Sequence, residues 1–210
     1  MRQVSARTVG RLSIYRRLLE EAIFRNESYM HSHELARRAG VGAAQVRRDL
    51  MASGYTGSPK HGYEIAKLHE SLSDFLDGRE TQNVALLGVG NLGRALLSYF
   101  RGGRSKLVIA ASFDNDPQKA GRVFHGCRCY SLDELPRTID EQNIKLGILT
   151  VPAESAQSSA DSLVDCGING ILNFAPVPIQ VPHGVYVENI DVTMFLERAA
   201  FFGRQQSGKK

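Results

Sequence analysis

The sequence predicts an α/β protein in which a small, mostly helical N-terminal domain precedes a larger domain built on a parallel β-sheet. Three observations support this prediction. The first 60 residues carry 11 Lys and Arg against 5 Asp and Glu, whereas residues 61–203 carry 12 against 17. Apolar residues recur at helical spacing over most of the first 80 positions. Short apolar runs then alternate with helical segments, as parallel βαβ units require.

The first part of the N-terminal domain is expected to contain two short helices joined by a tight turn, after a longer helix over residues 8–25. Ser32 lies in N-cap position before a helix over residues 33–39, and Gly40 ends that helix. A further helix over residues 43–52 follows almost at once. The apolar positions that predict the first helix are Leu12, Tyr15, Leu19, Ala22 and Ile23.

The helix over residues 43–52 has an apolar side and a polar side. Val46 and Leu50 are four positions apart and should face the core, while Gln45 and Arg48 point outward and Arg47 lies at the flank. Two short helices, a glycine turn and exposed polar residues on the second helix are typical of a helix-turn-helix. The basic charge of this region favours a polyanionic partner, although basic faces are often merely solvated.

Glycine and proline punctuate the next segment, and Tyr63 and Ile65 alternate with polar residues there, which predicts a β-hairpin. Lys60 would lie at its tip. A connecting helix over residues 66–78 should follow. Residues 1–80 are therefore expected to form a winged-helix domain.

Residues 81–190 are predicted to form a doubly wound parallel sheet of the Rossmann type. The apolar run 83–87 leads directly into a glycine-rich turn and a helix over residues 94–100. The later elements alternate in the same way. They are expected as strands over residues 107–113, 145–151 and 170–174, and a helix over residues 153–166.

The glycine-rich turn has the form GxGxxG and lies between a strand and a helix. Gly88 permits the tight turn, Gly90 permits close approach of a pyrophosphate, and Gly93 permits helix–strand packing. Asp114 ends the next strand, where its carboxylate can accept hydrogen bonds from ribose hydroxyls and repel a 2′-phosphate. No Arg or Lys follows in residues 115–117, so NADH and NAD⁺ are favoured over their phosphorylated forms. A turn that binds nothing, or that binds coenzyme A, is the alternative.

The C-terminal segment over residues 191–203 predicts a helix that is apolar nearly all round. Such a helix must be buried on several sides, and a second subunit is the natural cover. We therefore expect a homodimer in which this helix is exchanged between subunits, followed by a polar tail over residues 204–210. The alternative is a helix packed on its own sheet.

Several classes of protein are disfavoured by composition. We expect a cytoplasmic location, because the sequence shows neither a secretory leader nor a membrane-spanning apolar run. Cys127, Cys129 and Cys166 form no disulfide framework. Cys127 and Cys129 would share one face of a strand, where ordinary packing is favoured and a thiol switch is the alternative. No metal-ligating cluster stands out. Four of the six histidines precede the glycine motif, and the other two form no recognisable pair with a carboxylate, so we expect no catalytic residue.

Ordered segments from about residue 5 to residue 203 carry a resemblance to a known family. They are residues 11–12, 15–19, 45–50, 88–93, 113–114, 116–117, 151–153, 170–176 and 187–191. On these segments the chain resembles the Rex family, the redox-sensing transcriptional repressors of bacteria. The resemblance implies a homodimer that binds palindromic operator DNA and senses the NADH/NAD⁺ ratio. NADH would release it from operators near genes of respiration and fermentation, whereas NAD⁺ would permit binding.

The resemblance also implies residue roles. Arg47 and Arg48 would contact the major groove and the DNA backbone, and Tyr99 would lie near the nicotinamide. Arg17 and Asp191 would form a charge pair that acts in the switch. Further DNA contacts are expected from Arg11, Gln45 and Lys60. Further cofactor contacts, beside the glycines and Asp114, are expected from Val89, Asn91, Leu92, Val151, Pro152 and Asn173.

One departure from the family concerns the wing, where residues 58–61 interrupt a hairpin that is richer in glycine in the family. The sequence thus predicts a repressor rather than an enzyme. Two alternatives remain: a small NAD-dependent oxidoreductase with a basic N-terminal extension, and a coenzyme A-binding module.

Overall fold

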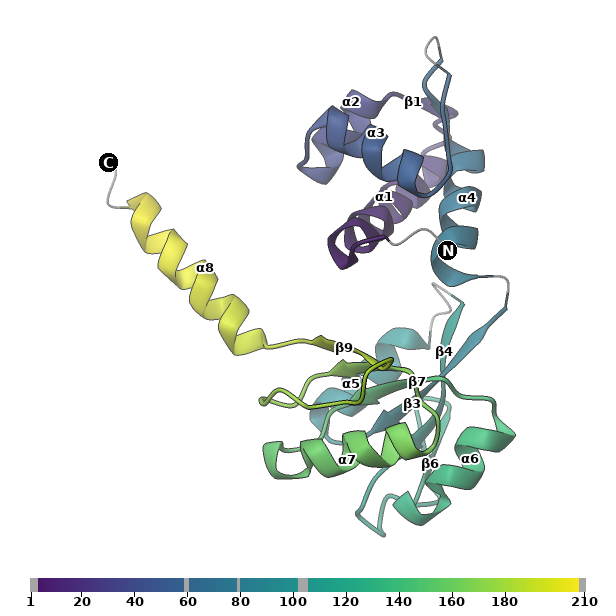
Figure 1. Cartoon of the computed structure of the whole chain (residues 1–210), viewed down its shortest axis with the longest axis vertical. Helices are drawn as coiled ribbons and strands as arrows, with labels where there is room; N and C mark the ends of the chain where they lie inside the picture. The colour runs from purple at the N-terminus through teal and green to yellow at the C-terminus, as the bar shows by residue number, and fades with distance from the viewer. Residues whose placement is uncertain (1–3, 59–60, 79, 102–105, 208–210) are drawn as a thin grey trace. The chain divides into compact units, whose positions relative to one another are not determined.

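The computed structural model describes residues 4–58, 61–78, 80–101 and 106–207. The chain divides into two compact units, Met1–Glu80 and Thr81–Lys210 (Figure 1). The division lies between residues 80 and 81, the same position as the expected domain boundary. Among the described residues, no helix combines the length and apolar character needed to cross a bilayer.

The first unit is a small bundle of helices with one short two-stranded sheet. The sheet pairs Tyr29 with Glu64 and Met30 with Tyr63 in antiparallel register. The elements are α1 (Ala6–Phe24), β1 (Tyr29–Met30), α2 (Ser32–Ala39), α3 (Ala43–Ala52), β2 (Tyr63–Glu64) and α4 (Ile65–Asp77).

The core of the first unit lies between α1, α3 and α4. Val46 and Leu50 of α3 are buried as predicted, and they share one cluster with Leu68 and Leu72 of α4. The α1 residues Leu12, Tyr15, Leu19 and Ala22 are each fully buried. Ile23 was expected on the same face and is 41% exposed, because it follows buried Ala22 by one position and is turned about 100° from it.

The helix-turn-helix is confirmed in its main features. Gly40 adopts φ +67° at the end of α2, the left-handed conformation that glycine favours. The N-cap of α2 differs from the prediction by one position. His31 has the extended backbone of a cap residue, and Ser32 is the first residue of the helix.

The wing differs in part from the expected hairpin. Ser58 and Gly62 form an antiparallel bridge, and β2 pairs with β1 rather than with a second arm of the wing. Ile65, expected in the hairpin, is the buried first residue of α4. The predicted tip residue Lys60 lies outside the described residues.

The second unit contains a seven-stranded sheet in the order β5-β6-β4-β3-β7-β8-β9. All neighbouring pairs are parallel except β5 with β6. Without β5, this is the strand order of a dinucleotide-binding fold. The strands are β3 (Gln82–Leu87), β4 (Leu107–Phe113), β5 (Val123–Phe124), β6 (Cys127–Tyr130), β7 (Leu146–Leu149), β8 (Gly170–Asn173) and β9 (Tyr186–Asn189).

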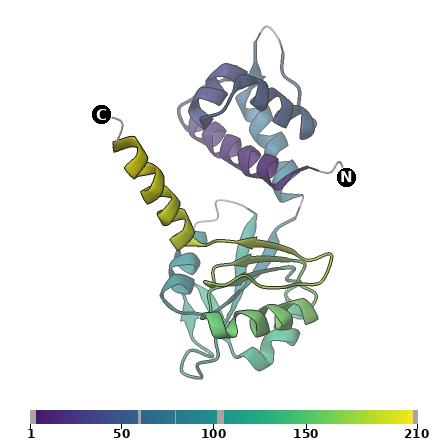
Figure 2. The ribbon, with the colours of Figure 1, turned by 60° about the vertical axis from the view of Figure 1, so that its left-hand side comes forward.

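Helices cover both faces of this sheet (Figure 2). Val84 and Leu86 of β3 share a cluster with α5 (Asn91–Phe100), and Ala85 and Leu87 share another with α6 (Leu135–Glu141) and α7 (Ala153–Asp165). A 3₁₀ turn, η1 (Leu132–Glu134), precedes α6. The expected burial of β3 on both faces is confirmed.

The buried thiols of β6 lie in the cluster under α5. Cys127 and Cys129 are 7% and 0% exposed and share one face, as the spacing predicts. Burial raises the pKa of both thiols above its ordinary value, although Ser112 opposes this effect. Packing is therefore a sufficient role for both side chains.

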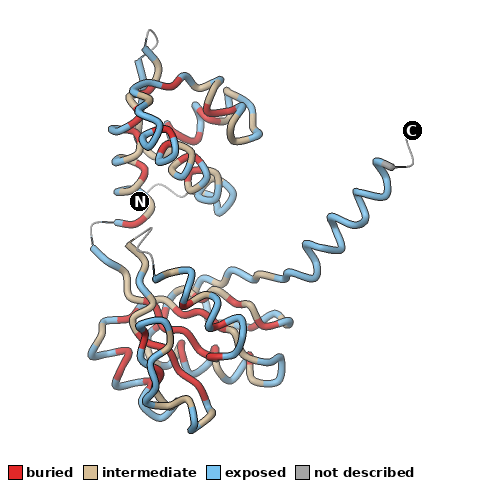
Figure 3. The backbone as a smooth tube through the Cα atoms, turned by 180° about the vertical axis from the view of Figure 1, so that it is seen from behind, coloured by how far each residue is buried: buried red, intermediate tan, exposed pale blue. Residues whose placement is uncertain are grey.

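The C-terminal helix, α8 (Val192–Ser207), is exposed along its length (Figure 3). It continues through four residues of the segment expected to be a polar tail. The alternative in which it packs on its own sheet is wrong, because its large apolar side chains are 40–70% exposed. They are Val192, Met194, Phe195, Leu196, Phe201 and Phe202.

Candidate functional site

The loop between β3 and α5 leaves space for a ligand to approach the backbone. Gly88 has φ +96°, and a Cβ there would lie 2.6 Å from the carbonyl oxygen of Thr150. A Cβ at Gly90 would meet nothing within 4 Å. The turn itself therefore requires glycine at position 88, whereas glycine at position 90 leaves room for a ligand. The free N–H groups at the start of α5 suit a pyrophosphate.

We expect different outcomes when Gly93 and Gly90 are each replaced by alanine. A Cβ at Gly93 would overlap the carbonyl oxygen of Gly88, so Gly93→Ala should lower the melting temperature and abolish NADH binding. Gly90→Ala should keep the wild-type melting temperature and lose NADH affinity. Thermal melts with and without NADH measure both effects. Equal melting temperatures for the two variants would contradict the packing role of Gly93.

Asp114 lies at the end of β4, beside the glycine loop, and is 6% exposed. Its Oδ2 accepts hydrogen bonds from Val89 N at 2.7 Å and from Lys119 Nζ at 2.9 Å, and its Oδ1 accepts one from Asp116 N at 2.9 Å. Burial alone would raise the pKa of Asp114, but these hydrogen bonds hold it below its usual value. The carboxylate is therefore ionised at neutral pH.

Lys119 is a site residue that the sequence analysis missed. It lies five positions after Asp114, beyond residues 115–117, which hold no cation, and its ammonium group pairs with the carboxylate. A carboxylate offers about four acceptor positions, and three are used here. One position on Oδ1 therefore stays available to a ribose hydroxyl, so the fit to a dinucleotide is retained.

A cavity of about 490 Å³ opens at the carboxyl ends of β3, β4 and β7. This is where the strand order reverses, the usual position of a nucleotide in such sheets. Its wall includes the predicted residues Gly88, Gly90, Leu92, Asp114, Val151 and Pro152. Its wall also includes residues not predicted, among them Asn115, Lys119, Leu132, Thr150, Ser155, Ser158, Ser159 and Phe174.

Several predicted cofactor residues lie away from the described cavity wall. Val89 is fully buried, and its N–H donates to Asp114. Asn91 begins α5, and Tyr99 is 64% exposed on that helix. Asn173 is fully buried; its Nδ2 donates to Val177 O at 2.8 Å and to Asn189 Oδ1 at 2.9 Å. The structure therefore gives Asn173 a role in holding the loop after β8, and the neighbouring Phe174 lines the cavity. A contact of Asn173 with the cofactor stays a prediction.

No metal centre is found in the part of the chain that the structure describes: no three His, Cys, Asp or Glu side chains there could hold an ion together. The polar cavity residues are mostly serines of α7 and the Asp114–Lys119 pair. These residues suit nucleotide binding.

The predicted DNA-reading side chains lie on α3. Arg47 and Arg48 are exposed and Gln45 is half-buried. Arg47 Nη1 donates to Ser32 Oγ at 3.1 Å, and Arg48 Nη2 donates to Gln45 Oε1 at 2.8 Å. The exposed face of the second helix of a helix-turn-helix is the part that enters the major groove.

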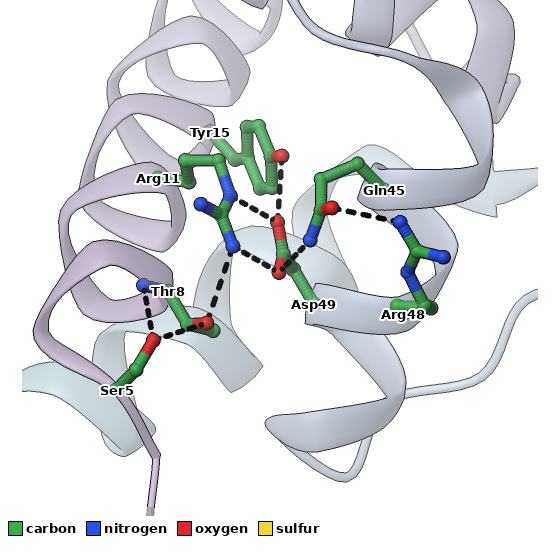
Figure 4. A network of polar contacts seen from close by, with 7 residues as sticks. All are labelled: Ser5, Thr8, Arg11, Tyr15, Gln45, Arg48 and Asp49. Atoms are coloured by element: carbon green, nitrogen blue, oxygen red, sulfur yellow. Dashed lines mark hydrogen bonds and ion pairs between the residues drawn. The ribbon is translucent and has the colours of Figure 1, made fainter.

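Arg11 has a different environment from the one expected. Its guanidinium forms a two-point ion pair with Asp49 of α3, a residue that is 2% exposed (Figure 4). Burial would raise the pKa of Asp49, but hydrogen bonds from Arg11, Gln45 and Tyr15 hold it below the usual value. Arg11 therefore ties α1 to α3, and its expected contact with DNA stays a prediction.

The two residues expected to act in the switch lie in different units. Arg17 is exposed on α1. Asp191 precedes α8, and its Oδ1 accepts a hydrogen bond from Met194 N at 2.9 Å. This is an N-cap contact, so the local role of Asp191 is observed while its pairing with Arg17 stays a prediction.

Comparison with known families divides the chain in the same way. Residues 3–50 match the family described as "Putative DNA-binding protein N-terminus". Residues 79–177 match the family described as "CoA binding domain". Neither match covers both units.

Whole-chain relatives decide the family. The redox-sensing transcriptional repressor Rex of Syntrophobacter fumaroxidans is 42% identical over 195 residues, which cover 92% of this chain and 93% of that protein. Rex of Leuconostoc citreum is 39% identical and covers 93% and 90% of the two chains. The chain belongs to the Rex family. Rex of Streptococcus mutans is 36% identical over 201 residues, which cover 95% of this chain.

Solved structures of Rex proteins agree with this assignment. The crystal structure of RSP, a Rex-family repressor, is 31% identical with a TM-score of 0.88 and covers 99% of this chain and 98% of RSP. The match to RSP in complex with β-NAD⁺ and operator DNA covers all of both chains, with the same TM-score and 30% identity. RSP in complex with β-NADH has a TM-score of 0.86 and 30% identity, and covers 99% and 97% of the two chains.

Proposed function

We propose that this Rex-family chain is a transcriptional repressor that binds a palindromic operator as a homodimer and is released when NADH binds. The observation that carries the proposal is the presence of two sites in one chain. One is a helix-turn-helix with exposed arginines, and the other is a cavity at the strand ends with Asp114 beside the glycine loop. RSP, which resembles the whole chain, has been solved with each of the matching ligands.

The exposed apolar side chains of α8 support the homodimer. Large apolar side chains that are exposed together on one helix are typical of an interface in a folded protein. A second copy that covers α8 would bury these side chains, and a two-fold dimer would present two copies of α3 to two half-sites. A repressor acts where the DNA is, so we place the protein in the bacterial cytoplasm.

The experiment begins with selection of a random-sequence duplex library on the wild-type protein. We expect the selected duplexes to share a palindrome. In a gel shift on such a duplex, NADH should release the protein at concentrations at which NAD⁺ does not. A complex that survives saturating NADH would contradict the proposed release.

Coenzyme A is the second candidate ligand, because residues 79–177 match a coenzyme A-binding family. Coenzyme A carries a phosphate on its adenosine ribose, and the Asp114 carboxylate disfavours that group at the end of β4. Titration of the protein with coenzyme A and with NADH separates the two candidates. Tighter binding of coenzyme A would favour the module over the redox sensor.

An oxidoreductase is the remaining alternative, and we propose that the chain is not an enzyme. The residues that line the described cavity offer no histidine as an acid or base, and the Asp114–Lys119 pair lies where the adenosine ribose would bind. Incubation with NADH and a panel of carbonyl substrates checks this proposal. Turnover of NADH would contradict it.

Asp191 gives a test of the switch. Its Oδ1 caps α8, and a carboxylate has a second oxygen that could pair with Arg17 in one of the two states. Asparagine is also a good N-cap, so Asp191→Asn should keep the melting temperature, operator binding and NADH binding. It should lose much of the NADH-driven release in a gel shift. Release at the wild-type NADH concentration would leave Asp191 with the capping role alone.

A further inference from the structure

Asp49 is a buried residue of α3 that accepts hydrogen bonds from side chains of α1 and of α3. It is 2% exposed and accepts four hydrogen bonds, which Figure 4 shows. Oδ2 accepts from Arg11 Nε at 2.7 Å and from Tyr15 Oη at 2.9 Å. Oδ1 accepts from Arg11 Nη2 at 2.7 Å and from Gln45 Nε2 at 2.8 Å. Each carboxylate oxygen therefore has two donors, which fills the acceptor capacity of the group.

This arrangement determines which way the Gln45 amide points. An ionised carboxylate can only accept hydrogen bonds, so the amide must turn its NH₂ group toward Asp49. Its carbonyl oxygen then faces the opposite way, where it accepts from Arg48 Nη2 at 2.8 Å. Gln45 lies three positions before Arg48 and four before Asp49, and both spacings make side chains neighbours on a helix, so Gln45 lies beside each of the two residues.

We propose that Gln45 is a positioning residue for Arg48, and that the Arg11–Asp49 ion pair holds Gln45 in the orientation this requires. Arg48 would then present its guanidinium to a base edge from an already ordered conformation. The proposal rests on the proposed DNA-binding function and concerns how one contact is prepared. Arg48 spends one of its five N–H donors on Gln45, which leaves a pair of donors for a guanine.

The competing role for Gln45 is direct reading of a base. Glutamine reads adenine by using its amide nitrogen and its amide oxygen together. In this structure the nitrogen already donates to Asp49 and the oxygen already accepts from Arg48. An amide nitrogen has a second N–H and an amide oxygen has a second lone pair, so direct reading would have to use these remaining groups. Positioning uses the two contacts that are already made.

Arg47 provides a control within the same helix. Its Nη1 donates to Ser32 Oγ of α2 at 3.1 Å, so its orientation depends on α2 and not on Gln45. Loss of the Gln45 side-chain amide should therefore change the contribution of Arg48 and leave that of Arg47 as it is. This difference makes the proposal testable by paired substitutions.

The experiment is a pair of double-mutant cycles on the full chain. Gln45→Met, a substitution of similar length with good helix propensity, is combined with Arg48→Ala and separately with Arg47→Ala. Fluorescence anisotropy at one salt concentration gives the affinity for a palindromic duplex selected on the wild-type protein. It also gives the affinity for versions of that duplex with single base-pair changes. Circular dichroism and NADH titration report whether each variant is folded.

We expect Gln45→Met to weaken binding about 3- to 10-fold, the cost of ordering one long side chain at the interface. In the Arg48→Ala background the same change should cost nothing further, whereas in the Arg47→Ala background it should cost as much as in wild type. Gln45→Met should also lose discrimination at the same base pair as Arg48→Ala. Gln45→Ala repeats the cycles with a smaller side chain if the methionine variant is misfolded.

Failure of the proposed function and failure of the positioning role give different results. A wild-type protein that selects no duplex would overturn both the proposed function and the positioning role. A wild-type protein that binds, with additive losses for Gln45 and Arg48, would overturn the positioning role alone. Loss of discrimination at a base pair that Arg48→Ala leaves unchanged would show that Gln45 reads a base itself.

Discussion

Replacing Phe195 and Phe202 together by glutamate should convert the protein into monomers of 23.1 kDa. The two residues lie seven positions apart on one face of α8 and are 49% and 56% exposed in the single chain. If a second copy covers this face, two glutamates would place unpaired charges in an apolar interface, at a large cost in free energy. The double variant should also bind operator about 100-fold more weakly or worse, since it engages one half-site at a time.

Light scattering after size-exclusion chromatography measures the mass, and anisotropy measures operator affinity. The matched control is the double change Gln205→Glu and Gln206→Glu, which adds the same charge to exposed polar positions of α8. The control should stay dimeric. A wild-type protein with the mass of one chain at micromolar concentration would contradict the dimer proposed from α8.

Replacing Asp114 by asparagine should raise affinity for NADPH relative to NADH. In the wild-type chain, Lys119 Nζ lies 2.9 Å from Asp114 Oδ2, so the carboxylate holds the ammonium group. Asparagine removes the charge that repels a 2′-phosphate and frees Lys119 to pair with that phosphate. A hydrogen bond between charged groups contributes about 1.5–3 kcal/mol, so the NADH/NADPH preference should fall by roughly 10- to 100-fold.

The fluorescence of the reduced nicotinamide reports binding of both cofactors. The control is the double variant Asp114→Asn with Lys119→Met, which should lose the gain in NADPH affinity because no cation remains at this position. Lys119→Met alone should reject NADPH more strongly than wild type does. Equal affinities of the wild-type protein for NADH and NADPH would contradict the ribose role of Asp114.

The sequence predicted those elements whose local pattern matches their burial. The strand before Gly88 is apolar on both faces because helices cover both sides of the sheet, and α3 has the expected buried and exposed sides. β9 was missed because an edge strand with a mostly exposed burial pattern shows no continuous apolar run. It is held by its pairing with β8, which no local pattern reports.

Local sequence patterns also predicted only part of the candidate site. Glycine spacing predicts the turn because the local backbone conformation or a close backbone approach requires glycine at these positions. The internal partner of Arg11 was not predicted because Asp49 lies 38 positions away, and a charge by itself does not reveal such a partner. Lys119 was missed because the side chain folds back on Asp114 from a turn that the strand pattern does not predict. Tertiary ion pairs of this kind need the fold before they can be recognised.

The buried thiols of β6 bear on which chemical signal the protein can detect. Attack on peroxide or on a disulfide requires an accessible thiolate, and Cys127 and Cys129 are shielded from solvent with a raised pKa. Oxidants therefore have no ready point of entry at this strand, whereas the cavity at the strand ends is open to a dissolved nucleotide. Through such a protein, a cell would respond to the state of its electron carriers. A sudden rise in peroxide would have little effect at these two sulfurs.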